Sequence, residues 1–396
     1  MEVFLLGGAR SPIGRYGGAL RPLRASEVAG PVAEALLERC QVPPHGVDRV
    51  IAGMVLQDMT ESNPARIVSE RIGIPHERPA FTLNMQCCSG MAALILAAQQ
   101  VALGEADRIL VLGLESMSRA PHMLADARWG TGRSHAPLTD TLVECTLAGS
   151  RMWGDPWDMI DVAEHHAKVD GISRQEMDEQ ALVSHERAVA ARDAGRFDAE
   201  IVPIRVPQAG GGERLFDADE HPRRGASPAG FAALPPVRPG GTVTAGNAAG
   251  IHDGAAAALV VSARALAKQG LRPLARLPLP GTALVGCDPR LMGYSAVRAL
   301  DAALSAAGRR LAEIDLIECN EGFAVQLLAC RRLGGWDAAR LNVDGGSLAL
   351  GHPVGMSGLR IAIHLAHALA ERGLARGAAA VPAGSGLGAA LLLERA

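Results

Sequence analysis

The sequence predicts an α/β protein made of two similar halves with an inserted segment between them. Three observations support this fold class. Apolar strand-like runs alternate with helix-like segments over residues 1–116, which is typical of a mainly parallel sheet covered by helices. The same succession of glycine-rich turn, long helix and apolar strand returns after residue 342. Between the two halves the composition changes, with many Met, His and Trp residues and glycine- and proline-rich runs.

The first half reads as a regular alternation of elements. Short β-branched and leucine-rich runs predict strands, and alanine-rich segments with apolar residues every three or four positions predict helices. In chain order we expect a strand at 3–6, a helix at 26–40, a strand at 50–54, a short helix at 63–72, a strand at 82–84, a helix at 91–103 and a strand at 109–112.

A cysteine turn precedes the helix at 91–103. Cys87 lies where the extended segment ends, and Ser89 is a suitable residue to cap the helix N-terminus. Backbone N–H groups and the helix dipole at that position favour a thiolate. Cys87 is therefore a candidate nucleophile; the alternative is that it is only a small buried hydrophobic residue.

The second half brings a histidine to the matching position. Residues 351–358 lead through His352 into a predicted helix at 359–372, followed by strands at 378–381 and 389–393. If the two halves are related by a pseudo-twofold axis, the turns at 87 and 352 face each other. A histidine in such a turn also has a purely structural interpretation, as a helix cap.

The segment between the halves is predicted to be a lid or binding-loop domain. Its strongest element is a helix that begins at the capping box formed by Ser173 and Glu176 and runs to Gly195. The predicted domains are residues 1–116 with 246–270, the insert 117–245, and residues 271–396.

Composition excludes several classes of function. The formal net charge is −3 and aromatic residues make up only 3% of the 396 residues, which argues against a nucleic-acid partner. We see no run with the 18 or so apolar residues of a membrane span and no basic leader, so we expect a cytoplasmic protein without a membrane partner. Seven cysteines without metal-site spacing leave room for a catalytic thiol.

A thiol, an imidazole and an amide on separate loops can form a nucleophilic set, here Cys87, His352 and Asn320. The segments that carry them, together with residues 8–14 and 241–250, resemble the thiolase family of acyl-CoA acyltransferases in five motifs in order. The resemblance covers essentially the full length. It implies the thiolase fold, with two repeated α/β halves in a five-layered αβαβα arrangement and an inserted loop domain.

The resemblance also implies roles for individual residues. Cys87 would accept an acyl group from a coenzyme A thioester, His352 would take its proton, and Asn320 would hold a water against the thioester oxygen. The N–H groups of Cys87 and Gly384 would form a second oxyanion hole. Coenzyme A would contact Arg223, Ala249 and Met159; Arg224 is either a further contact or a solvated charge. The family implies no metal and no cofactor besides the CoA thioester substrate, and a homodimer or homotetramer.

The chain departs from the family at the position of the second catalytic cysteine, the acid/base group, which is Pro382 here. The substitute cysteine of sterol-carrier-type thiolases falls on Gly322. Cys88, Cys319 and Ser385 are possible replacements. We expect acyl transfer with formation or cleavage of a carbon–carbon bond. Decarboxylative condensation, transfer to a non-carbon nucleophile and a non-catalytic scaffold role are alternatives.

A second departure affects the acyl pocket. Where the family usually has His-Met-Gly, this chain has Asp158, Met159 and Ile160, which predicts a reshaped pocket. Two other signals are weak. The glycines at 384, 386 and 388 lead into another strand and do not predict a dinucleotide site. His364 and His367 are one helical turn apart but have no evident third metal ligand.

Overall fold

The computed structural model describes residues 1–125, 127–154, 156–208 and 210–396. The first half contains β1 (Val3–Arg10), β2 (Gly14–Arg15), α1 (Ala25–Arg39), β3 (Arg49–Gly53), α2 (Pro64–Arg71), β4 (Ala80–Leu83), α3 (Ser89–Ala102), β5 (Arg108–Ser116), β10 (His252–Ser262) and α8 (Ala263–Gln269). The insert contains β6 (His122–Met123), β7 (Thr139–Asp140), α4 (Thr141–Leu147), α5 (Met159–Val169), α6 (Arg174–Asp193), β8 (Ile204–Pro207), β9 (Glu213–Phe216) and α7 (Pro228–Ala232). The second half contains β11 (Ala275–Leu277), β12 (Thr282–Gly286), α9 (Tyr294–Ala306), β13 (Leu316–Cys319), α10 (Ala324–Gly334), α11 (Ser347–Leu350), α12 (Val354–Arg372), β14 (Arg376–Ala383) and β15 (Leu387–Arg395).

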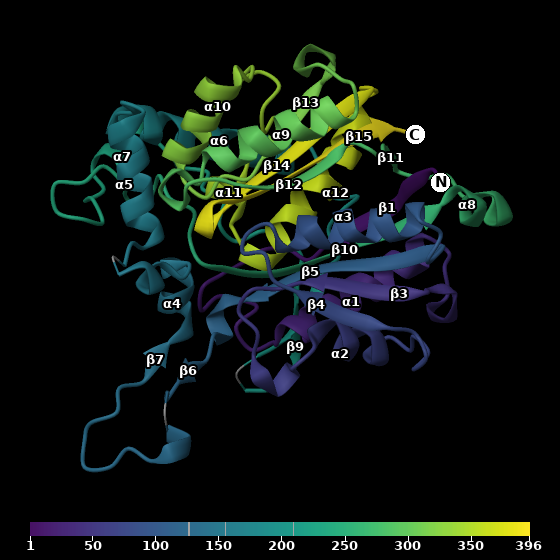
Figure 1. Cartoon of the computed structure of the whole chain (residues 1–396), viewed down its shortest axis with the longest axis horizontal. Coiled ribbons are helices and arrows are strands. Elements are labelled where there is room, and N and C mark those ends of the chain that lie inside the picture. The colour runs from purple at the N-terminus through teal and green to yellow at the C-terminus, as the bar shows by residue number, and fades with distance from the viewer. Residues whose placement is uncertain (126, 155, 209) are drawn as a thin grey trace.

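These elements stack in five layers, as Figure 1 shows. Helix α9 covers β12, β14 and β15, and α3 and α12 pack against each other in the middle layer. On the other side of that layer lie β10, β5, β3 and β4, and α1 and α2 form the outer layer beyond them. The predicted five-layered arrangement is confirmed. The boundaries predicted for the three domains stay a prediction.

The expectation of a mainly parallel sheet is wrong. Within the described residues the main sheet is mixed. Its strands lie in the order β13-β14-β15-β11-β1-β10-β5-β3-β4, with β12 beside β15 and β2 beside β10, while β6–β7 and β8–β9 form two separate two-stranded sheets. Among the pairings of these strands only β3–β4, β3–β5 and β13–β14 are parallel. Strand β15 follows β14 after the short turn Gly384–Gly386, which is too short for a crossover, so the strand must return antiparallel. Strand β10 enters after the insert and pairs antiparallel with both β1 and β5.

The two central helices approach so closely that their backbones touch. A Cβ atom added at Gly90 of α3 would lie 2.7 Å from the carbonyl oxygen of Gly355, and one added at Gly358 of α12 would lie 2.8 Å from the backbone nitrogen of Met91. Only glycine leaves room for this approach. The N-terminal ends of α3 and α12 are therefore held against each other, and the cysteine and histidine turns precede those ends.

The segment from Gln86 to Leu103, which includes α3, contradicts one of the predictions made from the sequence. By length and hydropathy it is an 18-residue candidate membrane span, contrary to the expectation that no run is long enough. Alanines raise its mean hydropathy, but most of its residues are buried inside the protein, between α12 and the strands β3 and β5. Its composition fits a core helix as well as a span.

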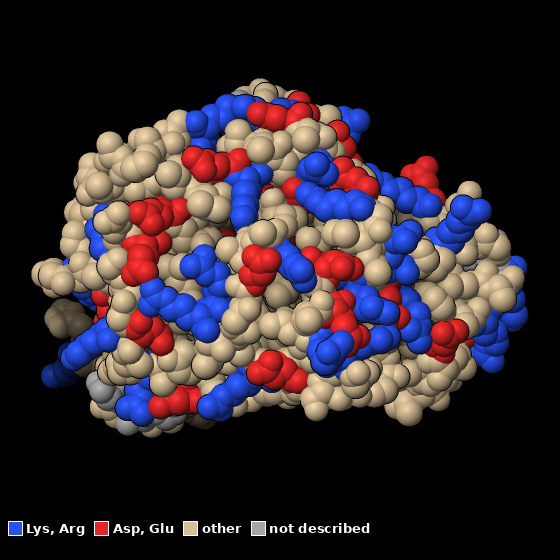
Figure 2. Space-filling model, turned by 90° about the horizontal axis from the view of Figure 1, so that it is seen from above, with Lys and Arg blue, Asp and Glu red and all other residues tan. Residues whose placement is uncertain are grey.

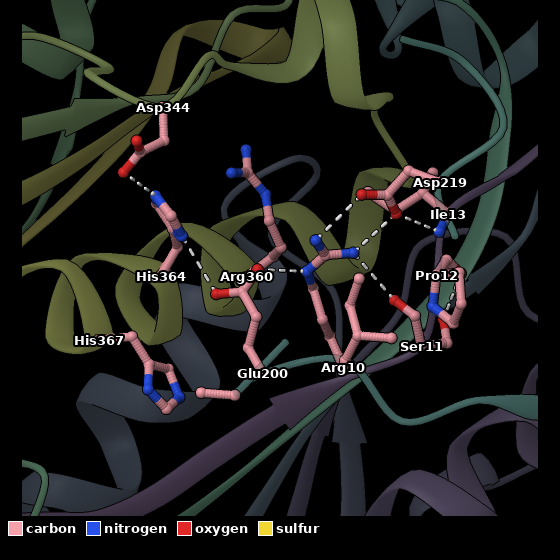
Figure 3. A network of polar contacts seen from close by, with 12 residues as sticks. Arg10, Ser11, Pro12, Ile13, Glu200, Asp219, Asp344, Arg360, His364 and His367 are labelled. Carbon is pink, nitrogen blue, oxygen red and sulfur yellow. Dashed lines mark hydrogen bonds and ion pairs between the residues drawn. The ribbon is translucent and has the colours of Figure 1, made fainter. Parts of the chain in front are cut away.

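Buried ion pairs join the insert to both halves (Figure 3). Arg10 of β1 is fully buried and contacts two carboxylates of the insert, Glu200 at 2.6 Å and Asp219 at 2.7 Å. His364 of α12 lies between Glu200, at 3.1 Å, and Asp344, at 3.3 Å. Despite burial, these carboxylates raise the pKa of His364 to about 10, so the ring is an imidazolium at neutral pH.

The surface charge is mixed. On the face seen in Figure 2, basic and acidic side chains are interspersed, and neither sign dominates a large area. This agrees with the formal net charge of −3.

Candidate active site

One cavity of about 490 Å³ collects most of the predicted site residues. Its lining includes Cys87, Asn320, His352 and Gly384 together with the predicted substrate contacts Met159 and Ala249. Arg223 does not line this cavity. It is exposed, and its backbone nitrogen donates to Nδ1 of His185 at 3.2 Å.

The turn that carries Cys87 is held by its own polar groups. Gln86 adopts a left-handed conformation with φ of 52°, which is uncommon for a residue other than glycine. The Ser89 hydroxyl donates to the Gln86 carbonyl at 2.6 Å and accepts from the Met85 N–H at 2.8 Å. Ser89 is therefore the first residue of α3 and not its N-cap, which is Cys88. The predicted cap is wrong because the serine closes the turn instead.

The structure brings the predicted nucleophile and base together. The Cys87 Sγ lies 3.3 Å from Nε2 of His352, although 265 residues separate them in the chain. On the other side of the ring, Nδ1 lies 2.6 Å from Oγ of Ser357. The Ser357 hydroxyl donates its hydrogen to the Pro353 carbonyl, so it must accept from Nδ1–H. This leaves the lone pair on Nε2, directed at the thiol.

Burial makes this a neutral pair. It raises the pKa of the Cys87 thiol to about 11, although backbone hydrogen bonds from Gly384 and from Cys87 itself act to lower it. Burial also lowers the pKa of His352 to about 3, with smaller effects of His252 and Arg360 in the same direction. The expected thiolate is therefore wrong for the resting protein, because desolvation outweighs the helix N-terminus. A neutral imidazole beside a thiol can still act as the proton acceptor.

Asn320 is fixed in orientation by a chain of buried donors. Arg360 donates to Oγ of Ser347 at 3.1 Å, and Ser347 donates to Oδ1 of Asn320 at 2.8 Å. The amide NH₂ group of Asn320 therefore faces the cavity, 3.4 Å from Nε2 of His352. Such an amide can hold a water next to the imidazole, as its predicted role requires.

Gly384 reaches the site from the β14–β15 hairpin. The N–H group of Gly384 makes a hydrogen bond to the Cys87 sulfur. The next residue, Ser385, adopts a left-handed conformation with φ of 64°, and its hydroxyl donates to the Ala148 carbonyl at 2.7 Å. The glycines at 384, 386 and 388 thus belong to a hairpin, which confirms that a strand and not a helix follows them. The N–H groups of Cys87 and Gly384 converge on the sulfur, where preorganised donors can stabilise an oxyanion.

The three predicted replacements for the acid/base cysteine do not line the cavity. The Cys88 thiol is buried and donates to the Val381 carbonyl, Cys319 is buried beside Gln326, and Ser385 lines a separate, smaller cavity. Pro382 and Gly322 do line the main cavity, and neither can exchange a proton. Cys145, which we did not select from the sequence, lines it as well.

The altered pocket residues are part of the same wall. Asp158 and Ile160 line the cavity beside Met159. The Asp158 carboxylate caps α5 by accepting from the N–H groups of Ile160 and Asp161, and it pairs with Arg238. Asp158 is thus occupied as a helix cap, while Ile160 adds an apolar side chain where the family usually has glycine.

Other predicted or overlooked residues have definite partners. Arg224 is exposed and ion-paired with Asp193, in agreement with the solvated-charge alternative. The Nε2 atom of His367 contacts the Gly8 carbonyl at 3.1 Å, whereas His364 contacts acidic side chains. Sequence reasoning missed Ser357 and Ser347. Both belong to the motif around His352, but their bonds depend on the folded loop.

Known proteins resemble this chain along its whole length. The family model "Thiolase, N-terminal domain" matches residues 3–264, and "Thiolase, C-terminal domain" matches residues 271–395. The acetyl-CoA acetyltransferase of Chromobacterium violaceum is 44% identical, with all of both chains covered, and the probable acetyl-CoA acetyltransferase of Escherichia coli is 43% identical over all of this chain and 99% of its own.

Solved structures share the fold. Human mitochondrial 3-ketoacyl-CoA thiolase superposes with a TM-score of 0.95 at 40% identity, and the Bacillus anthracis acetyl-CoA acetyltransferase with 0.96 at 38% identity; each comparison covers 100% of this chain and 99% of the other. With these matches over the whole length, the chain belongs to the thiolase family, and it is an acyltransferase.

Proposed function

We propose that Cys87 carries the acyl group in a two-step transfer from an acyl-CoA. In the first step the thiol proton moves to Nε2 of His352 as the sulfur attacks the thioester carbonyl. The carbon–sulfur bond to coenzyme A then breaks, and an acyl-Cys87 intermediate remains. The observation that carries this proposal is the 3.3 Å contact between Sγ and the Nε2 lone pair.

Two groups of donors would stabilise the developing oxyanions. The N–H groups of Cys87 and Gly384 would form one oxyanion hole, and a water held by Asn320 with His352 would polarise the other thioester oxygen. Removing one such donor typically costs a factor of about 10² to 10³ in rate. In the second step the acyl group would be joined to a carbon nucleophile, or a 3-ketoacyl-CoA would be cleaved by thiolysis.

Coenzyme A would enter along the wall formed by Ala249 and Met159, which line the cavity. Arg223 would hold the adenine side of the molecule. Its exposed position outside the cavity supports contact with the distal end of a long ligand and not with the acyl group. One solved human thiolase that resembles this chain, with 40% identity and a TM-score of 0.95, is in complex with CoA. No metal and no further cofactor enters this mechanism.

The acyl group need not be acetyl. The cavity lining is mainly apolar and includes Ile160, Leu142 and Phe323, so it can accept an aliphatic acyl chain. Relatives named acetyl-CoA acetyltransferase support acetyl-CoA as one donor to test.

The test is intact-mass measurement after incubation with a panel of acyl-CoAs. We expect one added acyl group, absent in Cys87→Ala and retained in Cys88→Ala, the matched variant of the adjacent buried thiol. His352→Gln should slow the addition. An adduct that persists in Cys87→Ala, or no adduct with any donor, would refute the proposed role of Cys87.

Pro382 favours a second candidate for the later step. It lines the cavity where the family places its acid/base cysteine, and proline has no proton to exchange. Decarboxylative condensation makes its carbanion by loss of CO₂ and needs no such group. Release of CO₂ from malonyl-CoA by the acylated enzyme would support this candidate over ordinary thiolysis.

We further propose a homodimer or homotetramer in the cytoplasm. Strand β4 is an edge strand and its residues are only half-buried, which suits pairing with a second copy. The arm around β6 and β7 extends from the body in Figure 1 and exposes Trp129 and Leu138. All seven cysteines are free thiols, as expected in a reducing compartment. Light scattering coupled to gel filtration tests the oligomeric state; a monomer would contradict the proposed homodimer or homotetramer.

A further inference from the structure

The second step of the proposed reaction requires a group that takes a proton from the α-carbon of an acyl-CoA and later returns it. Pro382 cannot do so. Among the residues that the structure describes, the titratable side chains that line the cavity are Tyr16, Cys87, Cys145, Asp158 and His352. Cys87 and His352 serve the acylation step, Asp158 caps a helix and pairs with Arg238, and Tyr16 is 59% exposed. Cys145 is the one that remains.

Cys145 lies in the last turn of α4 and is held by apolar neighbours. Its side chain packs against the buried cluster of Leu56, Met117 and Leu142, and it is only partly accessible. Among the described residues its thiol makes no hydrogen bond, so its proton is not committed to another group.

Cys145 also interacts electrostatically with the nucleophile, Cys87. Burial and the charges of Glu115 and Cys87 raise the pKa of Cys145 to about 12. Both cysteines line the same cavity. At rest, therefore, both are protonated thiols, and Cys145 can first act as an acid.

We propose that Cys145 is the second acid/base residue of this enzyme. It would take the role that other members of the family give to a cysteine at the position of Pro382. This inference rests on the proposed acyl-Cys87 mechanism. In the first step Cys145 gives its proton to the departing CoA thiolate and becomes a thiolate itself. In the second step it takes the α-proton of the incoming acyl-CoA.

The remaining events balance atoms and charge. The α-carbanion attacks the carbonyl of acyl-Cys87, a carbon–carbon bond forms and the carbon–sulfur bond to Cys87 breaks. The Cys87 sulfur takes back the proton held by His352. At the end Cys145 is again a thiol, and thiolysis of a 3-ketoacyl-CoA is the same sequence reversed.

The experiment separates the two steps in Cys145→Ala. Acylation of Cys87 is followed by intact mass with acetyl-CoA and longer acyl-CoAs, and α-proton abstraction by exchange of the acyl-CoA α-hydrogens in D₂O. We expect Cys87 to be acylated but α-exchange to fall by about 10²- to 10⁴-fold, the usual contribution of a positioned base. Cys145→Ser should behave alike, because a hydroxyl is a much weaker acid.

Two further variants make the test specific. Cys287→Ala removes a half-buried thiol that lies outside the cavity. The rate of α-hydrogen exchange in this variant should lie within about twofold of the rate in the unmodified chain. In the Cys145→Ala background, Pro382→Cys should restore exchange at least about tenfold, because it supplies a thiol at another position in the lining of the same cavity.

The outcomes distinguish this inference from the proposed function. If the unmodified chain forms no acyl-enzyme, the proposed function fails and this inference fails with it. If it forms the acyl-enzyme but shows no α-exchange, or if Cys145→Ala exchanges normally, only the role of Cys145 is refuted. Release of CO₂ from malonyl-CoA without α-exchange would likewise overturn it.

Discussion

Substituting Ser357 by alanine tests whether the tautomer of His352 controls the first step. In the folded chain Nδ1–H donates to Oγ of Ser357 at 2.6 Å, and Nε2 faces Cys87. Alanine leaves a buried donor without an acceptor, which costs about 1–3 kcal/mol. The lost bond is strongest when the ring is an imidazolium, so the cost falls on the transition state. We therefore expect acylation to slow by about 5- to 150-fold.

The assay is the rate of acyl-Cys87 formation, measured by quenched-flow mass spectrometry over a range of acyl-CoA concentrations. The maximal rate should fall while the half-saturating concentration changes little, because Ser357 does not line the cavity. Ser295→Ala is the matched control. Ser295 is equally buried and bonds backbone carbonyls, but it makes no hydrogen bond to His352 and does not line the cavity. If Ser357→Ala acylates within twofold of the unmodified chain, or if Ser295→Ala slows equally, the reasoning is wrong.

Three further predictions follow from the same geometry. Alkylation of Cys87 by iodoacetamide should rise with pH to beyond pH 9 without a plateau near neutrality, because a pKa raised to about 11 keeps the thiol protonated below that range; a plateau under pH 7 would contradict it. Because Cys145 supplies the proton in our proposal, Pro382→Cys alone should change the rate of thiolysis of a 3-ketoacyl-CoA, measured by loss of its enolate absorbance, by less than about fivefold; a rise of about 10²-fold or more would mean that the chain has no working acid/base group. His364→Gln should lower the free energy of unfolding in urea by about 1.5–3 kcal/mol, since Glu200 and Asp344 keep Arg10 and Arg372 as partners but lose a hydrogen bond to a buried cation, and the difference should shrink as pH rises through about 10; a change below about 0.5 kcal/mol would refute this.

The sign of the last prediction follows from the direction of the pKa shift. The folded-state pKa of His364 lies above its ordinary value of 6.5, so the folded state binds the proton more tightly than the unfolded chain. This contribution to stability is complete below about pH 6.5 and is lost as pH rises through about 10. The pairing carboxylate Glu200 has a pKa shifted downward by Arg10 and His364 despite burial, so its contribution is present at neutral pH and is lost only in strong acid.

The fold was largely predictable from local patterns. The helices now seen as α1, α2, α3 and α6 begin and end within a few residues of the ranges expected, because capping residues, glycines and apolar spacing are local signals. The repeat of two helix-opening turns was enough to predict that Cys87 and His352 meet. Strand direction was harder, because it depends on where the chain re-enters the sheet after the insert.

The electrostatic state of the site was not predictable in this way. A helix N-terminus is visible in the sequence, but the desolvation that outweighs it comes from residues throughout the chain that close over the sulfur. The same limit explains why Cys145 was missed. It lies in a seven-residue helix with no family motif, and only the folded insert brings it to the cavity wall. The roles of Cys87, Asn320, His352 and Gly384 stay predictions that the experiments above address.

The glycines where α3 crosses α12 have a consequence for how this enzyme can change over evolution. At Gly90 and Gly358 the backbones of α3 and α12 are in direct contact. The distance between the Cys87 sulfur and the His352 imidazole is therefore set by the packing of these two helices and not by the loops of the insert. The insert can then exchange side chains, lengthen or acquire new acyl preferences without moving the reacting atoms. A methyl group added at either glycine would push the two helices apart and separate Cys87 from His352. Substitutions should therefore be tolerated far more readily among the residues that line the cavity than at these two glycines.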